Sequence, residues 1–134
     1  MHSNLQRFII IKKGLDKYEI ITLDKSFHGQ KPLANPVAAY RPGKISKAVQ
    51  TVDTGFKQVE PNNFKAIEDA VTDKTAAIMI ELIQGESGVH PMDKEYVEKL
   101  RKLCDEKDII LIFDEVQTGM GRTGYLFCTS NVRR

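Results

Sequence analysis

An acidic pair, Asp114 and Glu115, directly follows the apolar run Ile109–Phe113 and is the strongest chemical signal in the sequence. A carboxylate at the rim of a buried strand loses solvent unless it finds a partner, so an acid at this place is unusual. Asp114 is therefore compatible with a metal ligand, a ribose contact or a cofactor contact. The alternatives are a solvated strand end and an acid that interacts with a helix dipole.

Two other polar segments stand in the same relation to apolar runs. Ser26–Gly29 follows a run that contains Ile20, and Gln84–Gly88 follows the run Ala76–Ile83. Ligands of open parallel sheets bind beyond the carboxyl ends of the strands. These two segments, together with Asp114–Gln117, are therefore the candidates for chemistry.

A metal site is the weakest of these possibilities. The histidines His2, His28 and His90 are widely scattered, and no group of His, Cys, Asp and Glu has the spacing of metal ligands. Gly119–Gly124 matches the dinucleotide-binding pattern G-x-G-x-x-G. However, the glycines do not follow the strand directly, and no amphipathic helix is expected to open after Gly124. A tightly turned loop is favoured over a nucleotide site.

Alternating strands and helices must position these segments. Short apolar runs predict strands, and apolar residues at helical spacing predict helices, which Asn63 and Asp93 are expected to cap. The predicted elements are, in order, strands at Tyr18–Leu23 and Phe56–Val59, a helix over 63–72, a strand at Ala76–Ile83, a helix after Asp93 and a buried strand at Ile109–Phe113. This order is typical of an α/β fold with a parallel sheet. Residues 29–55 are expected to form an irregular connection, with at most a short element at Ile45–Val52.

The composition is that of a soluble globular protein. The 134 residues include 20 Lys and Arg against 18 Asp and Glu, and this balance argues against nucleic-acid or membrane-surface binding through a basic face. No apolar run is long enough to span a bilayer, and the first residues lack the features of a secretion signal. Cys104 and Cys128 suggest no disulfide framework, so we expect reduced thiols and a cytoplasmic location.

Three segments together resemble the class III pyridoxal-phosphate-dependent aminotransferases, and within them most closely the acetylornithine aminotransferase group. The segments are Ser26–Gly29, Thr75–Glu86 and Leu111–Gly124. The resemblance extends over 14–29 and 55–127, whereas 30–54 and 128–134 diverge. It implies that residues 1–134 are part of the mainly parallel sheet of the large, cofactor-binding domain of a fold-type-I pyridoxal 5'-phosphate (PLP) enzyme.

The resemblance also implies roles for five residues. Asp114 would pair with the pyridine nitrogen of PLP and keep it protonated, because an adjacent anion favours the pyridinium form. Phe27 would stack on one face of the ring, Val116 would pack on the other, and Gln117 would lie near the phenolic oxygen. Glu86 would lie near the substrate. Core or rim packing remains the alternative for Phe27 and Val116, and a solvated loop acid is the alternative for Glu86.

Other features depart from the family pattern. The family lysine that forms the Schiff base lies beyond Asp114, yet residues 115–134 contain no lysine, so no catalytic residue is assigned. The family's phosphate-binding loop should precede Gly14, and Met1–Lys13 shows nothing like it. Because of these two departures, we expect a fragment that is inactive alone and that exposes apolar surface. Glu81, within the apolar run Ala76–Ile83, is expected to be a structural partner rather than a chemical one.

The family implies a reaction, partners and two alternatives. Its members move an amino group from an acetylornithine- or ornithine-like amino acid to the 2-oxo acid 2-oxoglutarate, and they form homodimers. One alternative is a non-catalytic interaction module that docks on a full-length relative. The other is a nucleotide-binding enzyme that uses Gly119–Gly124.

Overall fold

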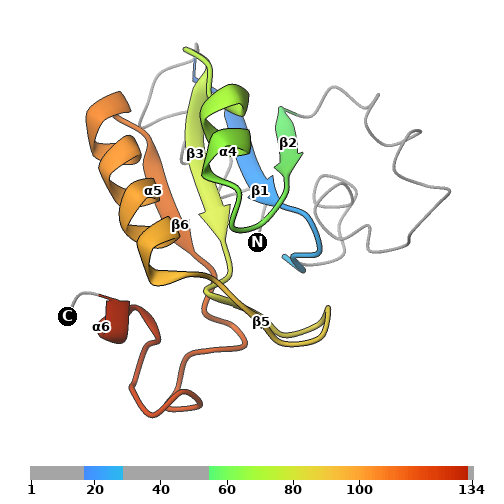
Figure 1. Ribbon diagram of the computed structural model, residues 1–134, viewed down its shortest axis with the longest axis vertical. Coiled ribbons are helices and arrows are strands. Elements are labelled where there is room, and N and C mark those ends of the chain that lie inside the picture. Colours follow the sequence, from blue (N-terminus) through green and yellow to red (C-terminus); the bar gives the residue numbers. More distant parts are fainter. Residues whose placement is uncertain (1–16, 29–54, 133–134) are drawn as a thin grey trace, which may run out of the picture.

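A four-stranded parallel sheet forms the centre of the computed structural model, which describes residues 17–28 and 55–132 (Figure 1). The strands lie in the order β2-β1-β3-β6. Their bounds are β1 Glu19–Leu23, β2 Phe56–Val59, β3 Thr75–Ile80 and β6 Ile110–Phe113. All three strand pairs are parallel, which confirms the predicted α/β fold with a parallel sheet.

The strand register brings the carboxyl ends of the strands to one side of the sheet. Leu23 of β1 is opposite Val59 of β2, and Ile80 of β3 is opposite Phe113 of β6. The segments that follow β1, β3 and β6 therefore leave the sheet close together. They are the three segments in which the sequence placed the chemistry.

Helices α4 (Phe64–Ala70) and α5 (Lys94–Lys107) pack against the same face of the sheet, as Figure 1 shows. Alternate strand residues point to this face, because side chains of a strand alternate in direction. The apolar stripe predicted for the second helix is buried there. The core on this face comprises Ile21, Leu23, Ile67, Ile78, Ile80, Leu82, Tyr96, Val97, Leu100, Leu103, Cys104 and Ile109. A second buried cluster consists of Ile20, Ala76, Ala77 and Met79.

The two helices begin where their predicted caps stand, but only one cap makes the expected hydrogen bond. The Asn63 side chain accepts a hydrogen bond from the backbone N–H of Ala66 at 3.1 Å. Asp93 precedes α5 without a side-chain cap hydrogen bond. The predicted helix over 63–72 ends earlier, at Ala70, because Val71 is already extended with ψ of 130°.

A small hairpin corrects the predicted strand Ala76–Ile83. That strand ends at Ile80, and Ile83 belongs to β4 (Ile83–Gln84), which pairs antiparallel with β5 (His90–Pro91). The physical reason is a polar residue within the apolar run: Glu81 follows the last paired residue of β3, Ile80, and its carboxylate binds the Phe27 N–H. The hairpin lies below the carboxyl end of β3 in Figure 1.

Strand β6 is only half-buried, although its apolar sequence predicted a buried strand. It lies at one end of the strand order, so within the described residues it pairs with β3 alone. A strand with one neighbour keeps part of its surface in solvent. Of the predicted run Ile109–Phe113, Ile109 is buried but precedes the strand.

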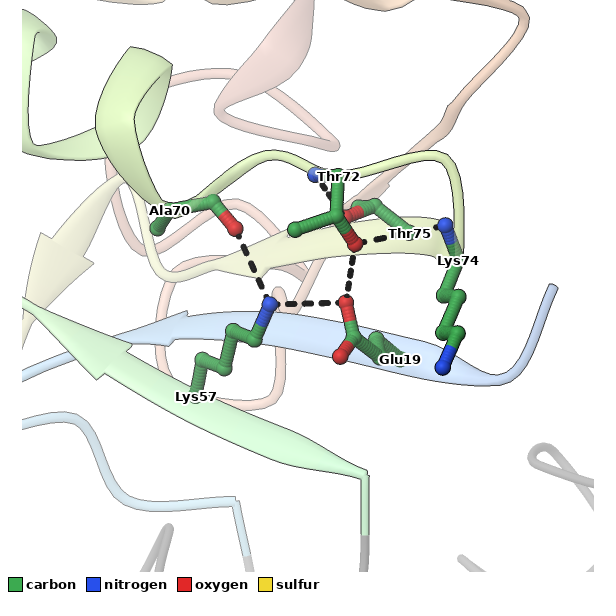
Figure 2. Close-up of polar contacts among 6 residues, drawn as sticks. All are labelled: Glu19, Lys57, Ala70, Thr72, Lys74 and Thr75. Atoms are coloured by element: carbon green, nitrogen blue, oxygen red, sulfur yellow. Dashed lines mark hydrogen bonds and ion pairs between the residues drawn. The ribbon is translucent and has the colours of Figure 1, made fainter.

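A polar network holds the opposite, amino-terminal end of the sheet together (Figure 2). The Glu19 carboxylate in β1 accepts hydrogen bonds from Lys57 of β2 at 2.7 Å and from the Thr72 hydroxyl. Lys57 also donates to the carbonyl of Ala70, the last residue of α4. Burial alone would raise the pKa of Glu19, but these hydrogen bonds and the charges of Lys57 and Lys74 keep it below its usual value. The network therefore ties two strands to the end of a helix.

The remaining described element is α6 (Thr129–Val132), a single short helix near the carboxyl terminus. Residues 29–54 of the irregular connection predicted over 29–55, including Ile45–Val52, lie outside the described residues. None of the helices within 17–28 and 55–132 is long and apolar enough to cross a membrane.

Candidate functional site

Two carboxylates lie next to each other at the carboxyl ends of β3 and β6. Glu81 follows Ile80 and Asp114 follows Phe113, and these apolar residues are partners in the parallel register. The backbone N–H of Asp114 donates to the carbonyl of Ile80 at 2.8 Å, so the pairing continues to the acids. Paired residues of neighbouring strands project from the same face of a sheet. The structure thus brings together two acids that are 33 positions apart in the sequence.

His28 is the partner of Asp114. Its Nδ1 lies 2.7 Å from Asp114 Oδ2, and the imidazole is fully buried. The other carboxylate oxygen, Oδ1, accepts a hydrogen bond from the backbone N–H of Val116 at 3.2 Å. Asp114 is therefore not a solvated strand end: only 12% of its side chain is exposed, and both of its oxygens are oriented by hydrogen bonds.

Glu81 is buried more deeply than Asp114, with 3% of its surface exposed. Its Oε2 accepts a hydrogen bond from the backbone N–H of Phe27 at 3.1 Å. Burial raises the pKa of Glu81, and the charge of Asp114 raises it further, against the opposing effects of the Phe27 N–H, His28 and the Ser26 side chain. The predicted structural role of Glu81 is consistent with these contacts.

The two carboxylates hold the backbone of the two apolar residues predicted to flank a ring. Glu81 binds the N–H of Phe27, and Asp114 binds the N–H of Val116. Both apolar side chains remain exposed, Phe27 by 37% and Val116 by 84%. Exposed large apolar side chains beside a buried acid are available to contact a ligand.

A separate cavity of about 450 Å³ contains the other two predicted residues, Glu86 and Gln117. It lies between the hairpin loop and the loop that follows β6. Its lining consists of Ile83, Gly85, Glu86, Val89, Gln117, Thr118, Arg122 and Thr123. Gly85 approaches Gln117 closely enough that an added Cβ would lie 3.5 Å from the Gln117 Cγ. The structure thus joins Glu86 to Gln117, whereas Asp114, Phe27 and Val116 are not part of this lining.

Glu115, the second acid of the pair, closes the loop over 116–128. Its carboxylate accepts hydrogen bonds from the backbone N–H groups of Cys128 and Thr129, from the Thr129 hydroxyl at 2.7 Å and from the Thr118 hydroxyl at 3.3 Å. Burial would raise the pKa of Glu115, but these hydrogen bonds lower it. The two acids of the pair therefore have different tasks, because Glu115 positions a loop.

The glycine-rich motif forms a turned loop without the geometry of a dinucleotide site. No helix begins at Gly124, and the next helix is α6, which starts at Thr129. Gly121 and Gly124 have positive φ angles of 84° and 87°, which favour glycine. Within the part of the chain that the structure describes, no group of three or more His, Cys, Asp or Glu side chains could hold a metal.

Sequence reasoning missed His28, Arg122 and the loop-closing role of Glu115. His28 stands in the segment Ser26–Gly29, which was singled out only because it follows a strand. Its position after β1 was therefore the available signal, but nothing local identified Asp114 as its partner. Arg122 stands in the glycine motif, and only the tertiary structure places it in the lining of the cavity with Glu86.

The chain matches the family described as Aminotransferase class-III over residues 5–133. It is 49% identical over 114 residues to the acetylornithine aminotransferase of Methanocaldococcus jannaschii. That alignment covers 85% of this chain and 28% of the relative. The chain therefore spans less than a third of the length of this curated relative.

Solved structures show the same relationship. The N-acetylornithine aminotransferase of Stenotrophomonas maltophilia superimposes with a TM-score of 0.73 at 32% identity, over 98% of this chain and 30% of the other. An ornithine aminotransferase from Toxoplasma gondii superimposes with a TM-score of 0.79 at 25% identity, over 99% of this chain and 32% of the other. The latter is described with partial occupancy of PLP at its active site.

Proposed function

This chain belongs to the class-III aminotransferases, as its motifs predict, and we propose that it provides the pyridine-nitrogen side of a PLP site in an amino-group-transferring protein. The sheet has the fold of the PLP-dependent aminotransferases of fold type I. The assignment of residues 1–134 to part of the cofactor-binding large domain remains a prediction. The amino donor we propose is an acetylornithine- or ornithine-like amino acid, and the acceptor is 2-oxoglutarate.

The single observation that carries this proposal is the oriented carboxylate of Asp114. His28 and the Val116 N–H hold its two oxygens, and the neighbouring Glu81 binds the N–H of Phe27. A carboxylate oxygen can accept more than one hydrogen bond, so Asp114 can still accept one from a protonated ring nitrogen. The residues present therefore fit a flat cationic ring such as a pyridinium. Asp114 provides the negative charge, and Phe27 and Val116 provide apolar side chains for its faces.

The roles of the other residues follow from this assignment. Bound PLP supplies an electron sink for the carbanion that amino transfer requires. Asp114 would hold the proton at the ring nitrogen, and Phe27 and Val116 would cover the ring and exclude water. Gln117 would donate a hydrogen bond to the phenolic oxygen. Glu86, which shares the cavity with Gln117, would contact the substrate.

We propose that these 134 residues do not turn over substrate by themselves. Residues 115–134 contain no lysine that could correspond to the family's Schiff-base lysine. The chain alone would keep the residues that orient a ring nitrogen.

A PLP-binding experiment tests this function. The purified chain is titrated with PLP, the absorbance is followed, and borohydride is then added to trap any imine. Wild-type protein should retain more PLP than Asp114→Asn, because the amide cannot stabilise a pyridinium. Asp73→Asn, in an exposed turn before β3, is the matched control and should behave like wild type. Equal retention by all three proteins, or turnover of acetylornithine by the wild-type chain, would contradict the proposal.

The exposed loop after β6 favours a second candidate, a non-catalytic module that docks on a full-length relative. Val116, Met120 and Leu126 expose 84%, 83% and 64% of their surfaces. Exposed apolar side chains grouped on one loop are typical of an interaction surface. Co-purification with a full-length class-III aminotransferase would support this candidate. A monodisperse monomer that shows no association with such an enzyme would reject it.

A further inference from the structure

We propose that Glu81, Asp114 and His28 form a buried proton-sharing cluster in which Glu81 carries a proton at neutral pH while Asp114 stays ionised. Glu81 is then a positioning residue: it holds Phe27 in place and leaves the single negative charge of the cluster on Asp114. The location of the proton is independent of the proposed function. Only its consequence for a ring nitrogen rests on that function.

Two carboxylates side by side at the end of a sheet cannot both ionise without a large cost. Glu81 and Asp114 follow residues that are paired in the register, and neither is solvated: 3% of Glu81 and 12% of the Asp114 side chain are exposed. Like charges that share such a site favour retention of a proton by one of them. The remaining question is which carboxyl carries it.

His28 assigns the ionised form to Asp114. The Nε2 atom of His28 is buried and has no hydrogen-bond partner among the described residues. A proton on Nε2 would therefore be a buried, unpaired donor, which is costly in either the imidazolium or the Nε2–H tautomer. The neutral tautomer with its proton on Nδ1 leaves Nε2 as an unpaired acceptor, which costs less than an unpaired N–H donor or a buried cation. That proton is donated to Asp114 Oδ2 across 2.7 Å, and the acceptor is best satisfied as a carboxylate.

The proton shared by the two acids then belongs on Glu81. The titratable groups that face Glu81 are Asp114 and His28. A neutral His28 cannot compensate the negative charge of Asp114, so a second negative charge on Glu81 would be repelled in a poorly solvated place. The hydrogen bond from the Phe27 N–H needs only an acceptor oxygen, which a protonated carboxyl also provides. The raised pKa of Glu81 agrees with this geometry.

NMR of the chain labelled with ¹³C in its glutamate carboxyl groups tests the proposal without PLP. The Glu81 signal is assigned from its loss in Glu81→Gln, and the exposed Glu98 on α5 provides the comparison. At pH 7 we expect the Glu81 signal to have the chemical shift of a protonated carboxyl, because burial and the charge of Asp114 disfavour the ionised form. In Asp114→Asn, which removes the repelling charge, the Glu81 midpoint should move down towards that of Glu98.

Two outcomes would overturn the proposal. One is a Glu81 signal that has the chemical shift of a carboxylate at pH 7, and the other is a Glu81 midpoint that does not respond to Asp114→Asn. The Glu81 signal can also be assigned through its correlation with the Glu81 backbone amide, so the second readout stands even if substitution of Glu81 prevents folding. A chain that fails to retain PLP but shows the shifted Glu81 midpoint would refute the proposed function and leave this inference intact.

The ring proton of His28 provides an independent check at pH 7. Glu81→Gln imitates the protonated carboxyl, so the Nδ1–H resonance of His28 should stay in place. Glu81→Leu removes the acceptor for the Phe27 N–H and should shift the Phe27 amide resonance. If Glu81 were ionised at pH 7, Glu81→Gln would remove a neighbouring charge and move the His28 resonance, which would contradict the proposal.

Discussion

The side chain of Tyr96 is buried without a hydrogen bond from its hydroxyl group to any residue that the structure describes. Tyr96 on α5 is 4% exposed, and its hydroxyl has no hydrogen-bond partner among the described residues. Burial without a partner raises the pKa of Tyr96 to about 12, because the phenolate would be poorly solvated. The hydroxyl therefore contributes little to stability, and the ring supplies the packing.

Replacement of Tyr96 by phenylalanine tests how much the hydroxyl contributes to the free energy of unfolding. At pH 7 the free energy of unfolding of Tyr96→Phe should equal that of wild type or exceed it by about 1 kcal/mol, because a buried unpaired hydroxyl is lost. Above pH 10 the unfolded tyrosine ionises while the folded one stays protonated, so wild type should lose stability as pH rises towards 12. Urea unfolding at several pH values measures this loss of stability. The part of the loss that Tyr96 causes should be absent in Tyr96→Phe.

A matched substitution separates burial from the chemistry of tyrosine. Tyr125, in the loop after β6, is 38% exposed, so Tyr125→Phe should change the free energy of unfolding at pH 7 very little. A clear destabilisation of Tyr96→Phe at pH 7 would show that the hydroxyl has a partner and would contradict the prediction.

The loop that joins β6 to α6 is an element fixed by one side chain. The Glu115 carboxylate binds the backbone N–H groups of Cys128 and Thr129 at its far end, and it also binds the Thr118 hydroxyl within it. These contacts join the two ends of a loop that has exposed apolar side chains. The lowered pKa of Glu115 means that this stabilisation is present above the ordinary value of 4.5 and is lost as pH falls through the lowered value.

Amide hydrogen exchange tests the closure of this loop. In Glu115→Gln the charge-assisted bonds are lost, and the Cys128 and Thr129 amides should exchange about 5–30-fold faster, which corresponds to roughly 1–2 kcal/mol. The amides of α5 should exchange as in wild type. Glu98→Gln, on the exposed side of α5, serves as the control. Unchanged protection of both loop amides would show that other contacts close the loop.

The described residues combine a buried sheet face with a loop after β6 that exposes large apolar side chains. The covered face is protected by α4 and α5, whereas Met120 and Leu126 expose 83% and 64% of their surfaces. The chain spans 28% of the length of the M. jannaschii relative. Exposed apolar surface of this kind favours self-association of the chain.

A double substitution tests the contribution of this loop to association. Met120→Asn combined with Leu126→Gln should lower dye binding to exposed apolar surface and shift the chain towards the monomer in size-exclusion chromatography. Asn suits position 120 because Met120 has a positive φ of 58°, which asparagine tolerates. Lys65→Gln, an exposed change on α4, is the control. A wild-type chain that is already a monomer with a cooperative, high-temperature melt would contradict the prediction.

Apolar patterning predicted most of the elements, and its failures have local physical reasons. Phe56–Val59 is a strand with the predicted bounds, and the apolar stripe of α5 is buried as expected. The run Ala76–Ile83 predicted one strand because hydropathy carries no information about the hydrogen bond between Glu81 and the Phe27 N–H. The half-buried state of β6 depends on how many neighbouring strands it has, which is a property of the sheet and not of its four apolar residues.

The sequence by itself determined the parallel α/β fold and the position of an acid at the end of a strand. Both follow from local periodicity, because a buried strand and its polar end are contiguous in the chain. Only the tertiary structure decided that His28 binds Asp114 and that Glu81 binds the Phe27 N–H. These partners are 86 and 54 positions apart, and the strand order and register bring them together. The charge of the site is therefore set by contacts that no local pattern contains.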